Sequence, residues 1–87
     1  MAKKIYVAEP KIVINTTDFS LMTLCYAIYE WEQGELAIAH VPCSDEARIE
    51  FEWGEGIVEI RQRVADDLLA SFPDISSNDI IFLGGWN

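Results

Sequence analysis

The spacing of apolar residues changes from two to about 3.6 within residues 47–72, which predicts a strand followed directly by a helix. The predicted strand 47–53 has one face of Ile49, Phe51 and Trp53 and an opposite face of Arg48, Glu50 and Glu52. The inner stripe of the predicted helix 57–72 consists of Ile57, Ile60, Val64, Leu68 and Phe72. Pro73 ends that helix because proline cannot continue it. A half-apolar strand beside an amphipathic helix favours a two-layer α+β domain.

Three other segments have the composition of strands. Residues 4–15 are rich in isoleucine and valine, and Pro10 suits an edge, a bulge or a short turn because it has no amide donor. In residues 35–42, the larger side chains Leu36, Ile38 and His40 alternate with Ala37, Ala39 and Val41, and the segment ends at Pro42. Residues 80–83 form a last short apolar run.

Residues 19–33 fit both spacings. The apolar residues at helical spacing are Leu21, Leu24, Cys25, Ile28 and Trp31. Candidate helix caps precede them at 15–18, and Gly34 follows as a helix stop. The residues that favour a strand instead are Tyr26, Ile28, Tyr29 and Trp31. A strand that turned back at Gly34 would set Glu32 opposite Glu35, a like-charge pair, so we favour the helix.

These segments make one domain, 1–87, of α+β class, with one or two helices packed on one face of an antiparallel sheet. With a helix at 19–33 the element order is β-α-β-β-α-β, the ferredoxin-like arrangement, and this order is favoured. With a strand there, the chain becomes a β-meander with a single C-terminal helix. In both cases one face of the sheet is open to water or to a partner.

Negative charge is concentrated in the middle of the chain. Residues 30–59 hold nine carboxylates and one basic residue, Arg48, a net charge of -8 out of -9 for the whole chain. These acids are interspersed with aromatic and aliphatic residues, so they belong to folded structure. An acidic surface repels phosphates and attracts basic surfaces, so direct binding to nucleic acid is not expected.

No residue pattern of a catalytic or cofactor site is present. His40 and two cysteines are too few for a zinc site, and the Asp/Asn spacing of calcium loops is absent. Gly54–Gly56 lacks the third glycine of a phosphate-binding loop. We therefore expect no enzyme activity, no metal and no cofactor.

The chain has no apolar run of the ~18 residues that a membrane span needs, and its N-terminus does not read as a signal peptide. We expect no membrane association and a cytoplasmic location, in the host cell if the protein is viral. In that compartment Cys25 and Cys43 are expected to remain reduced thiols.

The predicted partner-binding residues lie around the segment 35–55. They are Glu30, Trp31, Glu32, Glu35, Asp45, Glu46, Glu50, Glu52 and Glu55. Glu50 and Glu52 occupy the polar face of their strand, which is the open face of the sheet. Trp31 is an aromatic flanked by acids, and such aromatics bury a large area at an interface for little entropy loss.

These features predict a small acidic protein-binding module that inhibits another protein stoichiometrically. Its carboxylates would occupy a basic site that otherwise holds nucleic acid, as a nucleic-acid mimic does. In length and charge the chain resembles the small acidic phage proteins that disable host nucleases and defence complexes. The alternative is a structural or assembly component that self-associates or joins a larger complex. The protein is expected to be a monomer or a small homo-oligomer.

Overall fold

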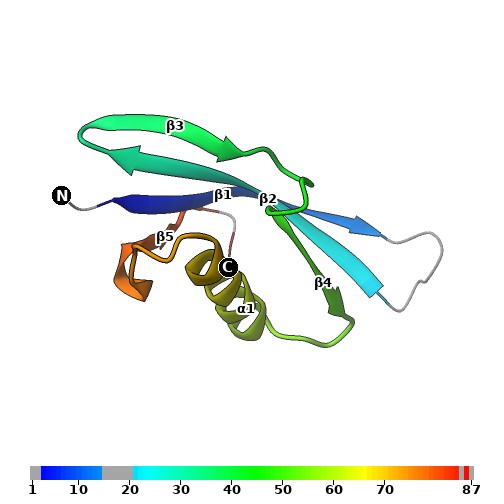
Figure 1. Ribbon diagram of the computed structural model, residues 1–87. Helices are drawn as coiled ribbons and strands as arrows, with labels where there is room; N and C mark the ends of the chain where they lie inside the picture. Colours follow the sequence, from blue (N-terminus) through cyan, green and yellow to red (C-terminus); the bar gives the residue numbers. More distant parts are fainter. Residues whose placement is uncertain (1–2, 15–20, 85, 87) are drawn as a thin grey trace.

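The computed structural model describes residues 3–14, 21–84 and 86 (Figure 1). Its elements are β1 (Lys4–Ile14), β2 (Leu21–Glu32), β3 (Glu35–His40), β4 (Arg48–Glu52), α1 (Ile57–Ser71), the short 3₁₀ turn η1 (Ser77–Asp79) and β5 (Ile80–Phe82). Helix α1 packs against one side of the sheet, and the long β1–β2 hairpin gives the molecule its elongated shape (Figure 1). The predicted two-layer α+β class is confirmed.

Strand β2 is the centre of the sheet. It pairs with antiparallel β1 along one side, and its other side is divided between β4, at residues 21–25, and β3, at residues 28–32. Strand β5 pairs with residues 5–7 of β1 in the parallel direction, so the sheet is mixed and not purely antiparallel. The chain returns to this parallel position through α1, as a crossover connection requires.

The favoured helix at 19–33 is wrong, because residues 21–32 form β2. Five consecutive residues, 24–28, are buried, and a strand covered on both sides shows no alternation that would reveal it. Gln33 and Gly34 both have positive φ, the geometry of a tight hairpin turn. The order is therefore the meander with a single helix, and the ferredoxin-like order is not adopted. The proposed helix caps at 15–18 lie outside the described residues.

Proline 10 sits at an irregularity of β1. The pairing of β1 with β2 shifts register between Ala8 and Lys11, and Glu9 has a φ of 56°. The strand therefore continues past the proline with a bulge, one of the outcomes expected from the sequence.

The core lies between α1 and the facing side of the sheet. The helix contributes Ile60, Val64 and Leu68, and the sheet contributes mainly Ile5, Val7, Met22, Leu24, Tyr26, Ile28, Ile49 and Phe51. Trp86 closes this layer near β5, and its indole Nε1 donates to the carbonyl of Val7 at 3.1 Å. Trp53 and Ile57 were expected to face inward, but they are 64% and 39% exposed. β4 ends at Glu52, so the alternation does not extend to Trp53.

The two cysteines are bonded to each other, contrary to the expectation of reduced thiols. Cys25 in β2 and Cys43 in the loop after β3 have Cα atoms 4.7 Å apart and form a disulfide. The pairing could not be derived from the sequence because it depends on β2 being a strand beside that loop. In the described residues, no helix has the length and apolarity to cross a bilayer.

Candidate functional site

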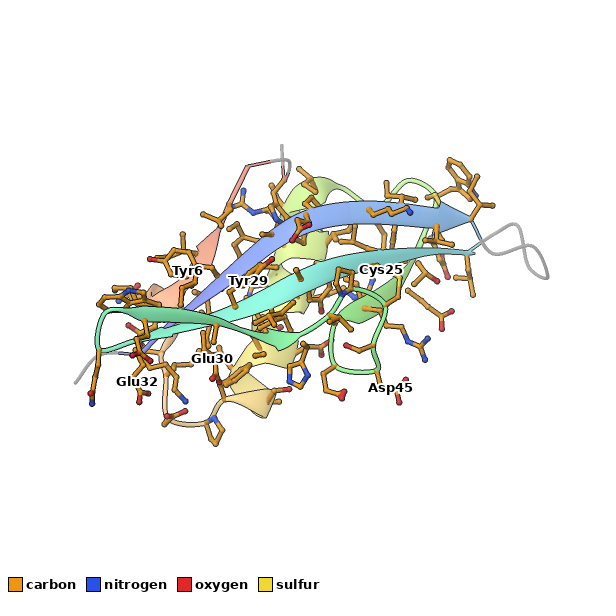
Figure 2. All side chains as sticks on the ribbon, turned by 90° about the horizontal axis from the view of Figure 1, so that it is seen from above. Tyr6, Cys25, Tyr29, Glu30, Glu32 and Asp45 are labelled. Carbon is orange, nitrogen blue, oxygen red and sulfur yellow. A yellow bond between two sulfur atoms is a disulfide. The ribbon has the colours of Figure 1, made fainter. Side chains whose placement is uncertain are left out.

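The side of the sheet opposite α1, called the open face here, carries rows of apolar and aromatic side chains. One row crosses four strands and consists of Ile38, Tyr29, Tyr6 and Ile81. The next row consists of Leu36, Trp31 and Lys4. Figure 2 looks down on this face and shows Tyr6 and Tyr29 lying beside each other on adjacent strands. Leu36 and Ile38 are 59% and 49% exposed, so no described element covers them.

A hollow of about 480 Å³ opens on this face, and we call it the aromatic hollow. It is lined by Tyr6, Ala8, Glu9, Tyr29, Trp31, Leu36 and Leu83. The small Ala8 side chain lies opposite Ala27, next to the pair formed by Tyr6 and Tyr29. Small residues beside large rings leave a depression, because neighbouring side chains on one face of a sheet stand side by side.

The one carboxylate in the aromatic hollow is held by the bulge in β1. The Tyr29 hydroxyl donates to Oε2 of Glu9 at 2.8 Å. This hydrogen bond raises the pKa of Tyr29, with a smaller contribution from the negative charge of Glu9. In a regular strand, the side chains of Ala8 and Glu9 would point to opposite faces of the sheet. The positive φ of Glu9 at the bulge breaks this alternation, so the side chains of both residues reach the open face.

The predicted acids near the β2–β3 turn lie on the other side of the sheet from Trp31. Glu30, Glu32 and Glu35, which we call the acidic tip, line a polar hollow of about 430 Å³ with Lys3. Lys3 Nζ is 3.8 Å from Glu30 and 3.2 Å from Asp74. Side chains alternate along a strand, so Trp31 projects to the opposite side from its neighbours Glu30 and Glu32. Trp31 and the acidic tip therefore cannot form one contact surface.

The acids of β4 do lie on the open face, as expected, but far from Trp31. Glu50 is opposite Thr23 and Glu52 is opposite Leu21. Eight residues of extended β2 separate Thr23 from Trp31, roughly 26 Å at the rise of a strand. Asp45 and Glu46 are exposed in the loop before β4, where Asp45 pairs with Arg48 at 3.0 Å.

Glu55 supports the fold at the junction of β4 and α1. Its carboxylate accepts the backbone amide of Glu52 at 2.6 Å and pairs with Arg63 at 2.8 Å. The hydrogen bond from Glu52 is the largest cause of the lowered pKa of Glu55, and Arg63 adds to it. Its negative charge is therefore already compensated within the molecule.

The predicted partner-binding residues thus occupy three places: the acidic tip, the aromatic hollow, and the region of β4 and its flanking loops, which we call the β4 end and which holds Asp45, Glu46, Glu50, Glu52 and Glu55. Sequence reasoning included Trp31 but missed Tyr6, Glu9, Tyr29 and Leu36. The signal was present in the strand alternative for 19–33, because a period of two puts Tyr29 and Trp31 on one face. It was lost when the helix was favoured.

The described residues contain no group of three or more His, Cys, Asp or Glu side chains suited to hold a metal ion. Comparisons with models of protein families, with curated proteins and with solved structures gave no match. The functional argument therefore rests on the chain's own surface.

Proposed function

We propose that this chain is a protein-binding module that docks the open face of its sheet onto a basic surface of another protein. The observation that carries the proposal is a sheet face with exposed Leu36 and Ile38 beside half-buried aromatic rings, on a chain with a net charge of -9. Contiguous exposed apolar surface is characteristic of interaction sites. The net negative charge of the chain favours a partner rich in lysine and arginine and speeds its approach.

The mechanism proposed for this module is stoichiometric inhibition. A basic site on a nuclease or another nucleic-acid-binding protein already displays the cations that Glu50 and Glu52 can pair with. Burial of Leu36 and Ile38 supplies the contribution to affinity that does not depend on salt. A module bound in this way competes with nucleic acid for the same surface and needs no chemistry of its own.

A cytoplasmic site of action was the expectation from the sequence, and the Cys25–Cys43 disulfide bears on it. Disulfides persist mainly in oxidising compartments, so the bond favours a target outside the reducing cytosol. A partner in either compartment fits the proposed docking mode.

The proposal is tested by capture and competition. The tagged protein is compared with a double variant of the open face, Leu36→Thr with Ile38→Thr, in which threonine keeps a good strand residue at both positions. Val58→Ala is the matched control, because Val58 is 74% exposed on α1, on the other side of the sheet. The wild type and the control should retain the same basic protein and displace its nucleic acid. The double variant should do neither, and equal capture by all three would contradict the proposal.

A second candidate, an assembly component, is favoured by the outer edge of β1. β5 pairs only with residues 5–7, so among the described strands none pairs with that edge of β1 at 11–14. Ile12, Val13 and Ile14 are exposed there, and such an edge can accept another strand. Two copies paired antiparallel about Val13 would set Ile12 opposite Ile14 on the same face. Solution mass tests this directly: a dimer that resists salt and is lost in Val13→Pro supports assembly.

A further inference from the structure

The aromatic hollow combines two kinds of surface that few single ligands satisfy together. Its walls are rings and aliphatic side chains, chiefly Tyr6, Trp31, Leu36 and Leu83. At one place on the rim is the Glu9 carboxylate, fixed by the Tyr29 hydroxyl at 2.8 Å. A purely apolar ligand would cover this carboxylate without pairing it, which is costly. A purely polar ligand would leave the rings in water.

The carboxylate keeps most of its capacity to bind a cation. A carboxylate has about four acceptor positions, and the bond from Tyr29 uses one of them. That bond also fixes where the charge stands, so little side-chain freedom remains to be lost when a ligand arrives.

The ligand that fits both surfaces has an apolar stem and a flat cationic head. The guanidinium of arginine stacks on aromatic faces, is weakly hydrated for a cation and pairs with carboxylates through two parallel hydrogen bonds. Its three methylene groups match aliphatic walls such as Leu36 and Leu83. Lysine offers a stem of similar length, but its compact ammonium is more strongly hydrated and does not stack.

We propose that the aromatic hollow on the open face receives an arginine side chain presented by the partner protein, with the guanidinium stacked on the aromatic rings and paired with Glu9. The inference rests on the proposed function and names the residue type that the module recognises. Anionic ligands such as phosphate are disfavoured by Glu9 and by the net charge of -9.

Two lysines of β1 lie on the open face: Lys11, opposite Cys25 on the Glu9 side of the hollow, and Lys4. Lys4 stands opposite Trp31, in the row beyond Tyr6 and Tyr29, whereas Glu9 lies beyond them in the other direction along β1. Neither lysine is among the residues that line the hollow. Lys4 therefore limits the site at the Trp31 end and Lys11 limits it at the Glu9 end, and attraction to the Glu9 carboxylate sets the position of the guanidinium between them.

The test uses short peptides with one variable side chain. The full chain is titrated with acetyl-Ala-Arg-Ala-amide, and binding is followed through the indole N–H signal of Trp31 and the ring signals of Tyr6 and Tyr29. The same peptide with citrulline in place of arginine has nearly the same shape but no charge. The peptide with lysine has the positive charge but lacks the planar guanidinium group. We expect saturable shifts with arginine and at least about threefold weaker binding of both other peptides, the scale of a cation–π contact.

Two variants locate the site, each with a control. Glu9→Gln should weaken binding of the arginine peptide at least about threefold, whereas Glu50→Gln, the same charge change at the β4 end of the face, should not. Tyr6→Leu keeps an apolar side chain, removes a ring and should weaken binding to a similar extent. Trp53→Phe should have no effect, because Trp53 does not line the hollow. Unchanged signals from the core in each variant establish that the fold is retained.

Several outcomes would overturn the inference. Equal binding of citrulline or lysine removes the assignment to arginine. Equal effects of Glu9→Gln and Glu50→Gln reduce the interaction to general charge attraction, and shifts confined to the acidic tip move the site elsewhere. If capture of a partner depends on Leu36 and Ile38 but the arginine peptide does not bind, the proposed function stands and the arginine site falls. If the arginine peptide binds but no partner is captured, the arginine site stands and the proposed function falls.

Discussion

Cys25 of β2 is bonded to Cys43, 18 residues later in the loop between β3 and β4. The bond ties this loop to the central strand, and β3 lies between the two cysteines along the chain. Closing a loop of this length restricts the unfolded chain and stabilises the fold by about 3 kcal/mol.

Breaking this disulfide should lower stability strongly without changing the fold. We expect Cys43→Ser to lose about 2–4 kcal/mol of unfolding free energy, measured by denaturant titration. The wild type in reducing agent should fall to the same value, and reducing agent should leave Cys43→Ser unchanged. A wild-type midpoint that does not respond to reduction would show that the bond is absent in solution.

Tyr26 should tolerate loss of its hydroxyl. The side chain is fully buried, its ring lies edge-on to Trp86, and its hydroxyl has no hydrogen-bond partner in the described residues. Burying an unpaired hydroxyl costs about 1–3 kcal/mol, so Tyr26→Phe should be neutral or stabilising in denaturant titration. A loss above roughly 1 kcal/mol would indicate a partner such as a bound water.

The same substitution should change the response to alkali. Burial raises the pKa of Tyr26 to about 12, and the negative charge of Asp67 adds to the shift. In the unfolded chain this hydroxyl ionises near its ordinary pKa of 10, whereas in the folded chain it stays neutral up to about 12. The stability of the wild type is therefore unaffected by this group below pH 10 and falls as the pH rises from 10 toward 12. Tyr26→Phe should therefore lose less stability than the wild type between about pH 10 and 12.

Glu55 should contribute to the loss of stability in acid. Its pKa is lowered by the amide of Glu52 first and then by Arg63, so its ionised form is favoured by folding. The contribution is present above the ordinary carboxyl pKa and is lost as the pH falls through the lowered value. Glu55→Gln should flatten the dependence of unfolding free energy on pH in that range.

The parts of this fold that the sequence predicted correctly are those with one unambiguous spacing. β4 alternates and α1 has an apolar stripe, and glycine or proline marks their ends, so both were found to within a residue or two. β2 failed because its middle is covered on both sides and fits either spacing. The opposition of Glu32 to Glu35 did not prevent the hairpin, because a cross-strand repulsion costs only about 0.2–1 kcal/mol. Lys3, beside both carboxylates, reduces that repulsion.

The candidate site was predicted less well than the fold, and for a related reason. Charge is visible in a sequence without knowledge of pairing, so the acids were identified at once. Which acids share a surface depends on strand register, and the structure separates them. The aromatic hollow required three facts that depend on tertiary pairing: Tyr6 opposite Tyr29, Trp31 on the same face, and Glu9 turned onto that face by a bulge.

Reversal of charge at the β4 end of the open face should separate binding from folding. Glu50 and Glu52 are exposed on the polar side of β4, so Glu50→Lys with Glu52→Lys should change stability by less than about 1 kcal/mol. Binding to a basic partner should weaken, mainly through slower association that depends on salt. Unfolding of this variant would show a structural role for the two acids. Unchanged association would remove the β4 end from the interface.

Trp31 distinguishes an interface residue from a structural one. It is half-buried on the open face, between Leu36 and Lys4 in its cross-strand row, and does not reach the core under α1. Trp31→Ala should therefore lower the unfolding free energy by only about 1 kcal/mol, the scale of a cross-strand pair. It should weaken partner binding by at least about 2 kcal/mol, as aromatic residues at the centre of interfaces do. Phe51→Ala is the matched control, because Phe51 is buried under α1 and its loss should cost about 3–5 kcal/mol of folding with unchanged affinity per folded molecule. If Trp31→Ala behaved like Phe51→Ala, the tryptophan would be structural and the aromatic hollow would lose its place in the interface.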